Sequence, residues 1–68
     1  MIKGDKVKVL RVPTGDSFYE TSKAKEDYLK TVGKEGIVTY ITNDAIIDVK
    51  FDDDEQAYSY EQYELELV

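Results

Sequence analysis

A β-hairpin is encoded by residues 36–51, which read GIVTYITNDAIIDVKF. Residues 37–41 are all β-branched or aromatic, which is the composition of a strand buried over much of both faces. The pair Asn43-Asp44 supplies the turn. The second strand, residues 45–51, alternates in character and points three apolar side chains to one face: Ile47, Val49 and Phe51. Tyr40 is also expected in the core.

A further strand is expected before the hairpin, at residues 6–12. Val7 and Val9 alternate with lysines, as in a half-buried strand. Leu10 and Val12 then take the opposite parity, which predicts either a bulge or coverage of both faces. Pro13 ends the strand because it has no N–H to donate to a neighbouring strand.

The chain after the hairpin predicts two more short strands. Residues 52–55 form a charged turn, and residues 56–60 form the fourth strand. A single 3₁₀ turn at 61–63 leads into the closing strand at 64–68. The long connection 13–32 is expected to be a mobile loop that contains two helical turns at 22–30, capped by Ser22.

Five short strands with one long first connection predict an all-β domain. At this size an open sheet would leave two unpaired edges and one uncovered face, so we expect a closed or nearly closed barrel. The 68 residues make one domain, in which residues 13–32 are a long inserted loop. The architecture expected from the sequence is a five-stranded barrel with a long, partly helical loop after the first strand.

The amino-acid composition excludes several kinds of functional site. The chain contains no cysteine and no histidine, which excludes a disulfide scaffold, a thiolate metal site and the commonest general base. No apolar run is long enough for a membrane span, and the first five residues are too short and polar for a signal peptide. We therefore expect a cytoplasmic protein that is not an enzyme, with no cofactor and no membrane partner.

Charge is distributed unevenly. Residues 1–34 carry a net charge of +3 and residues 35–68 carry −9, for a total of −6. Such an acidic domain repels phosphate backbones, so binding to nucleic acid is disfavoured. The densest acidic cluster is residues 52–55, which lacks the spacing of a calcium loop and is interpreted as a solvated turn, with no metal bound.

Two spacings resemble the opening of KOW-type and other SH3-like barrels: Gly4-Asp5-x-Val7-x-Val9 and Gly33-x-x-Gly36-x-Val38. Residues 47–53 and 63–68 are similar to the closing half of the same barrels. A weaker similarity, through residues 6–11 and 64–68, is to the SH3-like peripheral subunit of photosystem I. The resemblance implies an SH3-like barrel, although residues 13–32 stand where the KOW motif has a brief turn. Free-standing domains of this kind resemble accessory proteins of bacteria and phages.

The aromatic residues suggest a binding surface. In SH3-like barrels the long first loop packs against the closing strands, so their tyrosines are expected to line one groove flanked by carboxylates. Such a groove suits a basic or proline-containing segment of a protein partner. The alternative interpretation is that several rings only cap the barrel ends. The residues expected to bind the partner are Phe18, Tyr19, Glu20, Tyr28, Tyr58 and Tyr60.

The first strand offers a second possible surface. Its bases form a stripe that, with tyrosines nearby, would make a KOW-like site for RNA or DNA. The competing interpretation is that the stripe neutralises the acidic second half of the same molecule. The residues of this alternative site are Lys3, Lys6, Lys8, Arg11 and Lys34.

Overall fold

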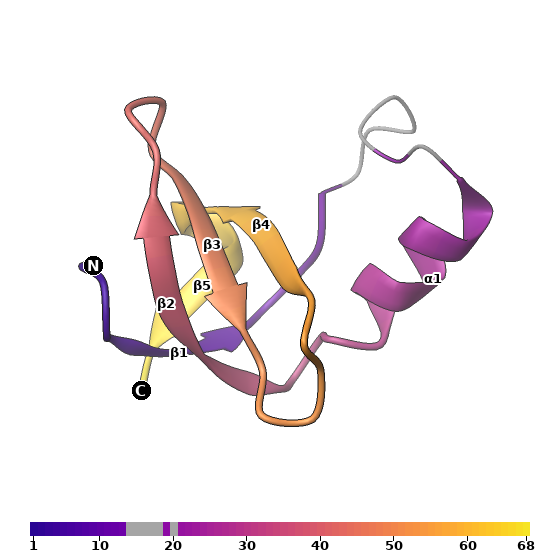
Figure 1. Ribbon diagram of the computed structural model, residues 1–68, viewed down its shortest axis with the longest axis horizontal. Helices are drawn as coiled ribbons and strands as arrows, with labels where there is room; N and C mark the ends of the chain where they lie inside the picture. The colour runs from indigo at the N-terminus through magenta and orange to yellow at the C-terminus, as the bar shows by residue number, and fades with distance from the viewer. Residues whose placement is uncertain (14–18, 20) are drawn as a thin grey trace.

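The structure, a computed structural model, describes residues 1–13, 19 and 21–68. These residues form five antiparallel strands in one sheet and one short helix, which stands to one side of the sheet (Figure 1). The elements, in chain order, are β1 (Lys6–Val9), α1 (Ser22–Leu29), β2 (Glu35–Ile41), β3 (Ile46–Lys50), β4 (Ala57–Glu61), the 3₁₀ turn η2 (Gln62–Glu64) and β5 (Leu65–Leu67).

The strands follow the order β4-β3-β2-β1-β5, so β4 and β5 form the two edges of the sheet. The mainly β architecture predicted from the sequence is confirmed. Within the described residues no strand pairing joins β4 to β5, so the sheet is not closed and the expected barrel is not confirmed. The turn η2 connects these two edges directly along the chain.

The core lies on one face of the sheet. Alternation in β3 turns Ile47 and Val49 inward, and Phe51 follows on the same side, as the sequence predicts. The buried apolar residues are Val7, Val9, Val12, Val38, Ile47, Val49, Phe51, Tyr58, Tyr60 and Leu65. β2 approaches β3 closely at Gly36, where an added Cβ would lie 2.7 Å from both the Lys50 carbonyl oxygen and a Val49 methyl group.

A β-bulge in β2 overturns one expectation from the sequence. Val38 pairs with Val49, but Tyr40 pairs with Asp48, so one extra residue, Thr39, is inserted in β2. The insertion reverses the parity of the strand, and Tyr40 consequently points outward with 60% of its surface exposed. The prediction of a core Tyr40 and of a strand buried on both faces is therefore wrong.

The first strand is shorter than the predicted 6–12, because β1 ends at Val9 rather than at Pro13. The amides of Leu10 and Arg11 both donate to the Glu64 carbonyl oxygen, at 2.8 and 3.5 Å, so these amides bond to η2 and not to a neighbouring strand. Leu10 is exposed and Val12 is buried in the core. The two alternatives left open by the sequence, a bulge or coverage of both faces, concern residues that lie outside the strand.

Helix α1 occupies most of the predicted helical segment. Its N-cap is Thr21 rather than Ser22, because the Thr21 hydroxyl oxygen accepts from the Ala24 amide at 3.1 Å. None of its residues is fully buried. The turn after the helix contains Gly33 at φ +86°, a conformation that glycine adopts without strain. The Gly33 amide then donates to the Val9 carbonyl at 2.8 Å and returns the chain to the sheet.

Candidate partner-binding groove

Four tyrosines meet where α1 faces β4. Tyr28, from α1, lies at the centre of the cluster, and its ring makes edge-to-face contacts with three others. The ring centroids are 5.4 Å from Tyr19, 4.9 Å from Tyr58 and 5.6 Å from Tyr60. Edge-to-face pairs at these distances stabilise beyond the effect of buried area alone. The cluster therefore holds the helix against the sheet.

The hydroxyl groups of this cluster bind to the protein itself. The Ser59 amide, on β4, donates to the Tyr28 hydroxyl oxygen at 3.0 Å. The Tyr60 hydroxyl lies 2.6 Å from Thr31 Oγ1, which also donates to the Tyr28 carbonyl oxygen at 2.6 Å. These bonds tie β4 to the helix and to the turn that follows it.

Burial keeps these hydroxyls protonated. Desolvation raises the pKa of Tyr58 to about 12, and the hydrogen bond to Asp54 acts in the same direction. Desolvation also raises the pKa of Tyr28, against the opposing effect of the bond from Ser59. The pKa of Tyr60 is raised by burial as well. At neutral pH the tyrosine cluster contributes rings and neutral hydroxyls.

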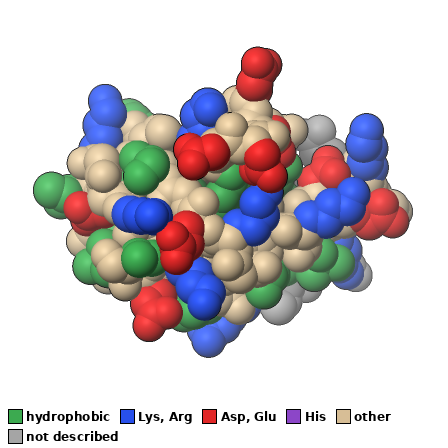
Figure 2. Space-filling view, turned by 90° about the horizontal axis from the view of Figure 1, so that it is seen from below, with side chains coloured by type: hydrophobic (Ala, Val, Ile, Leu, Met, Phe, Trp, Pro, Cys, Tyr) green, Lys and Arg blue, Asp and Glu red, His purple; other side chains and the backbone are tan. Residues whose placement is uncertain are grey.

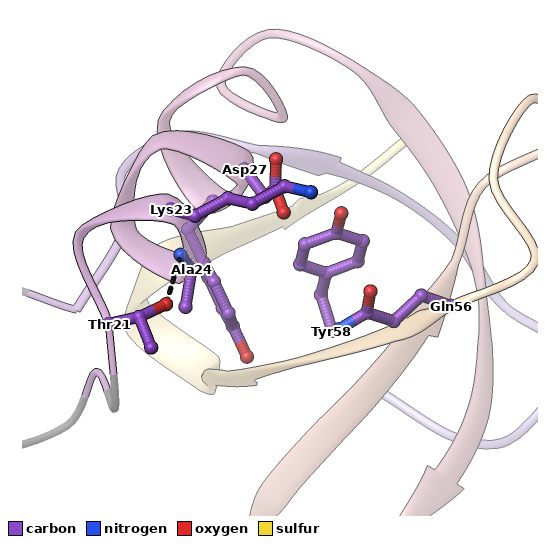
Figure 3. A pocket seen from close by; sticks show the side chains of 7 residues that line it. Thr21, Lys23, Ala24, Asp27, Gln56 and Tyr58 are labelled. Atoms are coloured by element: carbon purple, nitrogen blue, oxygen red, sulfur yellow. Dashed lines mark hydrogen bonds between the residues drawn. The ribbon is translucent and has the colours of Figure 1, made fainter.

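Beside the cluster lies a pocket of about 220 Å³, here called the α1 groove. Side chains of α1 form one wall, including Ala24, Asp27 and Tyr28, and the opposite wall comes from Gln56 and Tyr58 (Figure 3). A smaller hollow of about 120 Å³ shares Asp27 and Tyr58 with it and reaches the acidic turn. The two hollows together form a recess with aromatic and carboxylate walls.

The acidic turn, residues 52–55, adjoins this recess. Lys34 Nζ binds both oxygens of Asp53, at 2.7 and 2.8 Å, and the side-chain hydrogen bond from this ammonium is the main cause that lowers the pKa of Asp53. Asp54 accepts from the Gln56 amide at 2.9 Å and from the Tyr58 hydroxyl at 2.8 Å, and its pKa is also lowered. Among the described residues, Asp52, Asp54 and Glu55 have no ion pair with a basic side chain.

The structure brings together part of the predicted partner-binding set. Tyr19, Tyr28, Tyr58 and Tyr60 form one cluster, but Tyr58 and Tyr60 are only 3% and 1% exposed. Their rings therefore serve mainly to anchor α1, and little of the Tyr58 surface is open to a ligand in the groove. Phe18 and Glu20 lie outside the described residues.

Several lining residues were not predicted as contacts. These are Thr21, Lys23, Ala24 and Gln56, none of which is aromatic or acidic. The useful signal was the i,i+4 spacing of Ala24 and Tyr28, which places both on one helix face. The same spacing also favours helix formation in general, so by itself it does not indicate a pocket wall.

The five bases of the alternative nucleic-acid site are dispersed. Lys6 pairs with Glu35 at 3.2 Å, and the Lys34 ammonium turns away to the acidic turn. Arg11 Nη1 donates to the Tyr63 carbonyl at 3.0 Å. Figure 2 shows basic and acidic side chains interspersed on one face of the molecule rather than gathered by sign. Within the described chain only Lys3 and Lys8 have neither an ion pair nor a side-chain hydrogen bond among these five bases.

Comparison with protein-family models, curated proteins and solved structures found no match to this chain. A search of the described residues found no group of acidic side chains arranged to hold a metal ion. In that part of the chain no helix has the length and apolar character needed to cross a membrane.

Proposed function

We propose that this chain is a non-catalytic protein-interaction module that binds a basic or proline-containing segment of a partner in the α1 groove. The single observation that carries the proposal is the recess between α1 and β4, where tyrosine and carboxylate side chains line two adjoining hollows. Rings bind the apolar part of a proline, lysine or arginine, and carboxylates pair with the cation.

Local charge supports a basic segment at the turn end of the recess. Asp54 reaches into the smaller hollow, and Asp52 and Glu55 extend the negative surface next to it. Lys34 neutralises only Asp53 among these acids. The smaller hollow is also lined by Lys30 and Lys34, so a cation that enters from the turn end is attracted mainly by Asp52, Asp54 and Glu55, which form no ion pair among the described residues.

We further propose that the sheet is an SH3-like barrel whose open side is bridged by η2. The Leu10 amide donates to the Glu64 carbonyl, which brings η2 against the end of β1. The Glu64 side chain is buried, and its Oε1 accepts from the Glu61 amide at 2.8 Å. η2 thus makes hydrogen bonds to the residue after β1 and to Glu61 at the end of β4, on the side of the sheet where we propose that it closes the barrel.

The KOW-like nucleic-acid role is less well supported. It requires a concentrated stripe of free bases, whereas Lys6, Arg11 and Lys34 make contacts within the protein. An oligothymidine titration at two salt concentrations provides the comparison, because phosphate binding weakens steeply as salt rises. Tight, salt-sensitive binding of this probe would favour the alternative function.

The proposed function is tested by amide chemical-shift mapping with a short Pro/Arg peptide and its Pro/Glu counterpart. We expect the basic peptide alone to shift the amides of residues 21–28 and 54–58. Ala24→Arg fills the groove and adds a repelling charge, so it should weaken binding roughly ten-fold or more. Leu29→Arg adds the same charge on the exposed part of the helix and is the matched control.

Unchanged binding in Ala24→Arg would show that the groove is not the site. Equal weakening by Leu29→Arg would show that only the net charge of the helix matters. Shifts confined to β1 and its neighbours would likewise overturn the assignment, because they would place the peptide on a different surface.

A further inference from the structure

A larger hollow lies at the other end of β4, where the turn between β2 and β3 meets η2. It is open, has a volume of about 510 Å³, and is lined by Asp44, Ala45, Glu61, Gln62 and Tyr63. We call it the hairpin basin. The α1 groove is formed at the beginning of β4, by Gln56 and Tyr58, so the two hollows share no lining residue.

Tyr63 is an aromatic side chain of the basin and is contacted by Arg11. The Arg11 guanidinium carbon lies 5.8 Å from the centroid of the Tyr63 ring. Arg11 also donates to the Tyr63 carbonyl oxygen. The ring nevertheless remains 59% exposed. An exposed ring that is already ordered loses little conformational entropy when a ligand packs on it.

The charge of the basin has one sign. Asp44 and Glu61 are both exposed, and in the described chain neither forms an ion pair with a basic side chain. Among the described residues no lysine or arginine lines the hollow, and Arg11, which contacts Tyr63, is not part of its lining. The α1 groove, in contrast, is lined by Lys23, and the smaller hollow beside it is lined by Lys30 and Lys34. The basin is therefore the hollow with the clearer preference for a cation.

The backbone of the basin is strained at one residue. Ala45 has φ +63°, in the left-handed region that costs a residue with a Cβ about 1–2 kcal/mol. Three hydrogen bonds hold the turn, from the Ala45 amide to the Thr42 carbonyl, from the Thr42 amide to the Ile46 carbonyl and from the Ile46 amide to Thr42 Oγ1. Glycine would fit this position with less strain, but the alanine side chain adds apolar surface to the wall of the basin.

We propose that the hairpin basin binds a lysine or arginine side chain of a protein partner. The aliphatic stem packs on Tyr63 and Ala45, and the cationic head lies between the carboxylates of Asp44 and Glu61. An aromatic face together with carboxylates matches both halves of such a side chain. This site is separate from the α1 groove, and it does not depend on whether that groove binds a partner.

The experiment uses N-acetyl-arginine amide as the probe and N-acetyl-citrulline amide as an uncharged control of nearly the same shape. We expect the arginine probe to produce saturable shifts in the amides of Asp44, Ala45 and residues 61–63. The citrulline probe should produce much smaller shifts, because it keeps the stem but lacks the charge. The arginine shifts should weaken as salt is added.

Three variants test the assignment. Asp44→Asn and Glu61→Gln should each weaken arginine binding roughly two- to five-fold, the size expected for one exposed charge pair. Glu61→Gln keeps the size of the side chain and one acceptor oxygen, so it removes the charge with little change in shape. Asp52→Asn removes one carboxylate from the acidic turn and is the matched control, for which we expect unchanged affinity.

The proposal is overturned if the citrulline probe binds equally well, since the basin would then recognise no charge. It is also overturned if Asp52→Asn weakens binding as much as Asp44→Asn, since the attraction would then come from the overall acidity. Absence of any shift at the basin with the arginine probe would refute it directly. Ala24→Arg leaves this assay unchanged, which separates the basin from the α1 groove.

Discussion

Replacing Tyr28 by phenylalanine removes a single oxygen atom from the contact between α1 and β4. The ring keeps its edge-to-face contacts with the neighbouring tyrosines, at centroid distances of 4.9–5.6 Å. What is lost is the acceptor for the Ser59 amide at 3.0 Å. The variant therefore measures how strongly this hydrogen bond fastens the helix to the edge of the sheet.

The expected loss of stability is about 1 kcal/mol, in the middle of the range for one net hydrogen bond. Ser59 is half-buried, so water replaces the lost acceptor only in part. For a domain of this size, about 1 kcal/mol corresponds to a fall in Tm of roughly 4–8 °C. The Ser59 amide should also exchange faster with deuterium in the variant than in the wild type.

Urea unfolding and amide hydrogen exchange together provide the assay. Tyr40→Phe is the matched control, because Tyr40 is 60% exposed and its hydroxyl has no hydrogen-bond partner among the described residues. This control should unfold like the wild type. If Tyr28→Phe has the stability of the wild type and the Ser59 amide keeps its protection, the helix is not fastened through this bond and the reasoning is refuted.

Three further variants probe other features. Gly36→Ala should lower the free energy of unfolding by roughly 1–3 kcal/mol in urea titrations, because its Cβ would overlap the Lys50 carbonyl, and an unchanged midpoint would contradict this close approach. Ala45→Gly should raise Tm by a few degrees in a thermal melt, since glycine relieves the strain at φ +63°. Burial raises the pKa of Glu64, so the folded state holds this proton more tightly than the unfolded chain does. Wild-type stability relative to Glu64→Gln should therefore fall as pH rises above about 4.3, the ordinary glutamate pKa. If the raised pKa of Glu64 is wrong, urea unfolding curves across that pH range will show a constant difference in the free energy of unfolding between the wild type and Glu64→Gln.

The sequence was most informative where alternation is regular. Ile47, Val49 and Phe51 point to one face in the structure because their spacing matches the two-residue period of a strand. The reversal at Tyr40 could not be predicted in the same way. Every residue near Thr39 suits a strand, so the inserted residue changes no local preference and leaves no pattern to detect.

The candidate site was predicted in outline only. The sequence correctly grouped the tyrosines of the first connection with those of β4. It could not distinguish an exposed ring from an anchoring one, because tyrosine suits both environments. That distinction is made by partners distant in sequence, such as Thr31 for Tyr60 and Ser59 for Tyr28. The hairpin basin was missed for the same reason, since Asp44 and Tyr63 meet only through the fold.

The outer edge of β4 affects how readily molecules of this protein pair their sheets and aggregate at high concentration. Sheets polymerise when a bare strand recruits a strand from another molecule. Here the amides of Ser59 and Glu61 already donate to a phenol and to a carboxylate, so a foreign strand must displace both before it can pair. A strand from another molecule would therefore pair more easily with the opposite edge of the sheet, but β5 offers only three residues for such pairing.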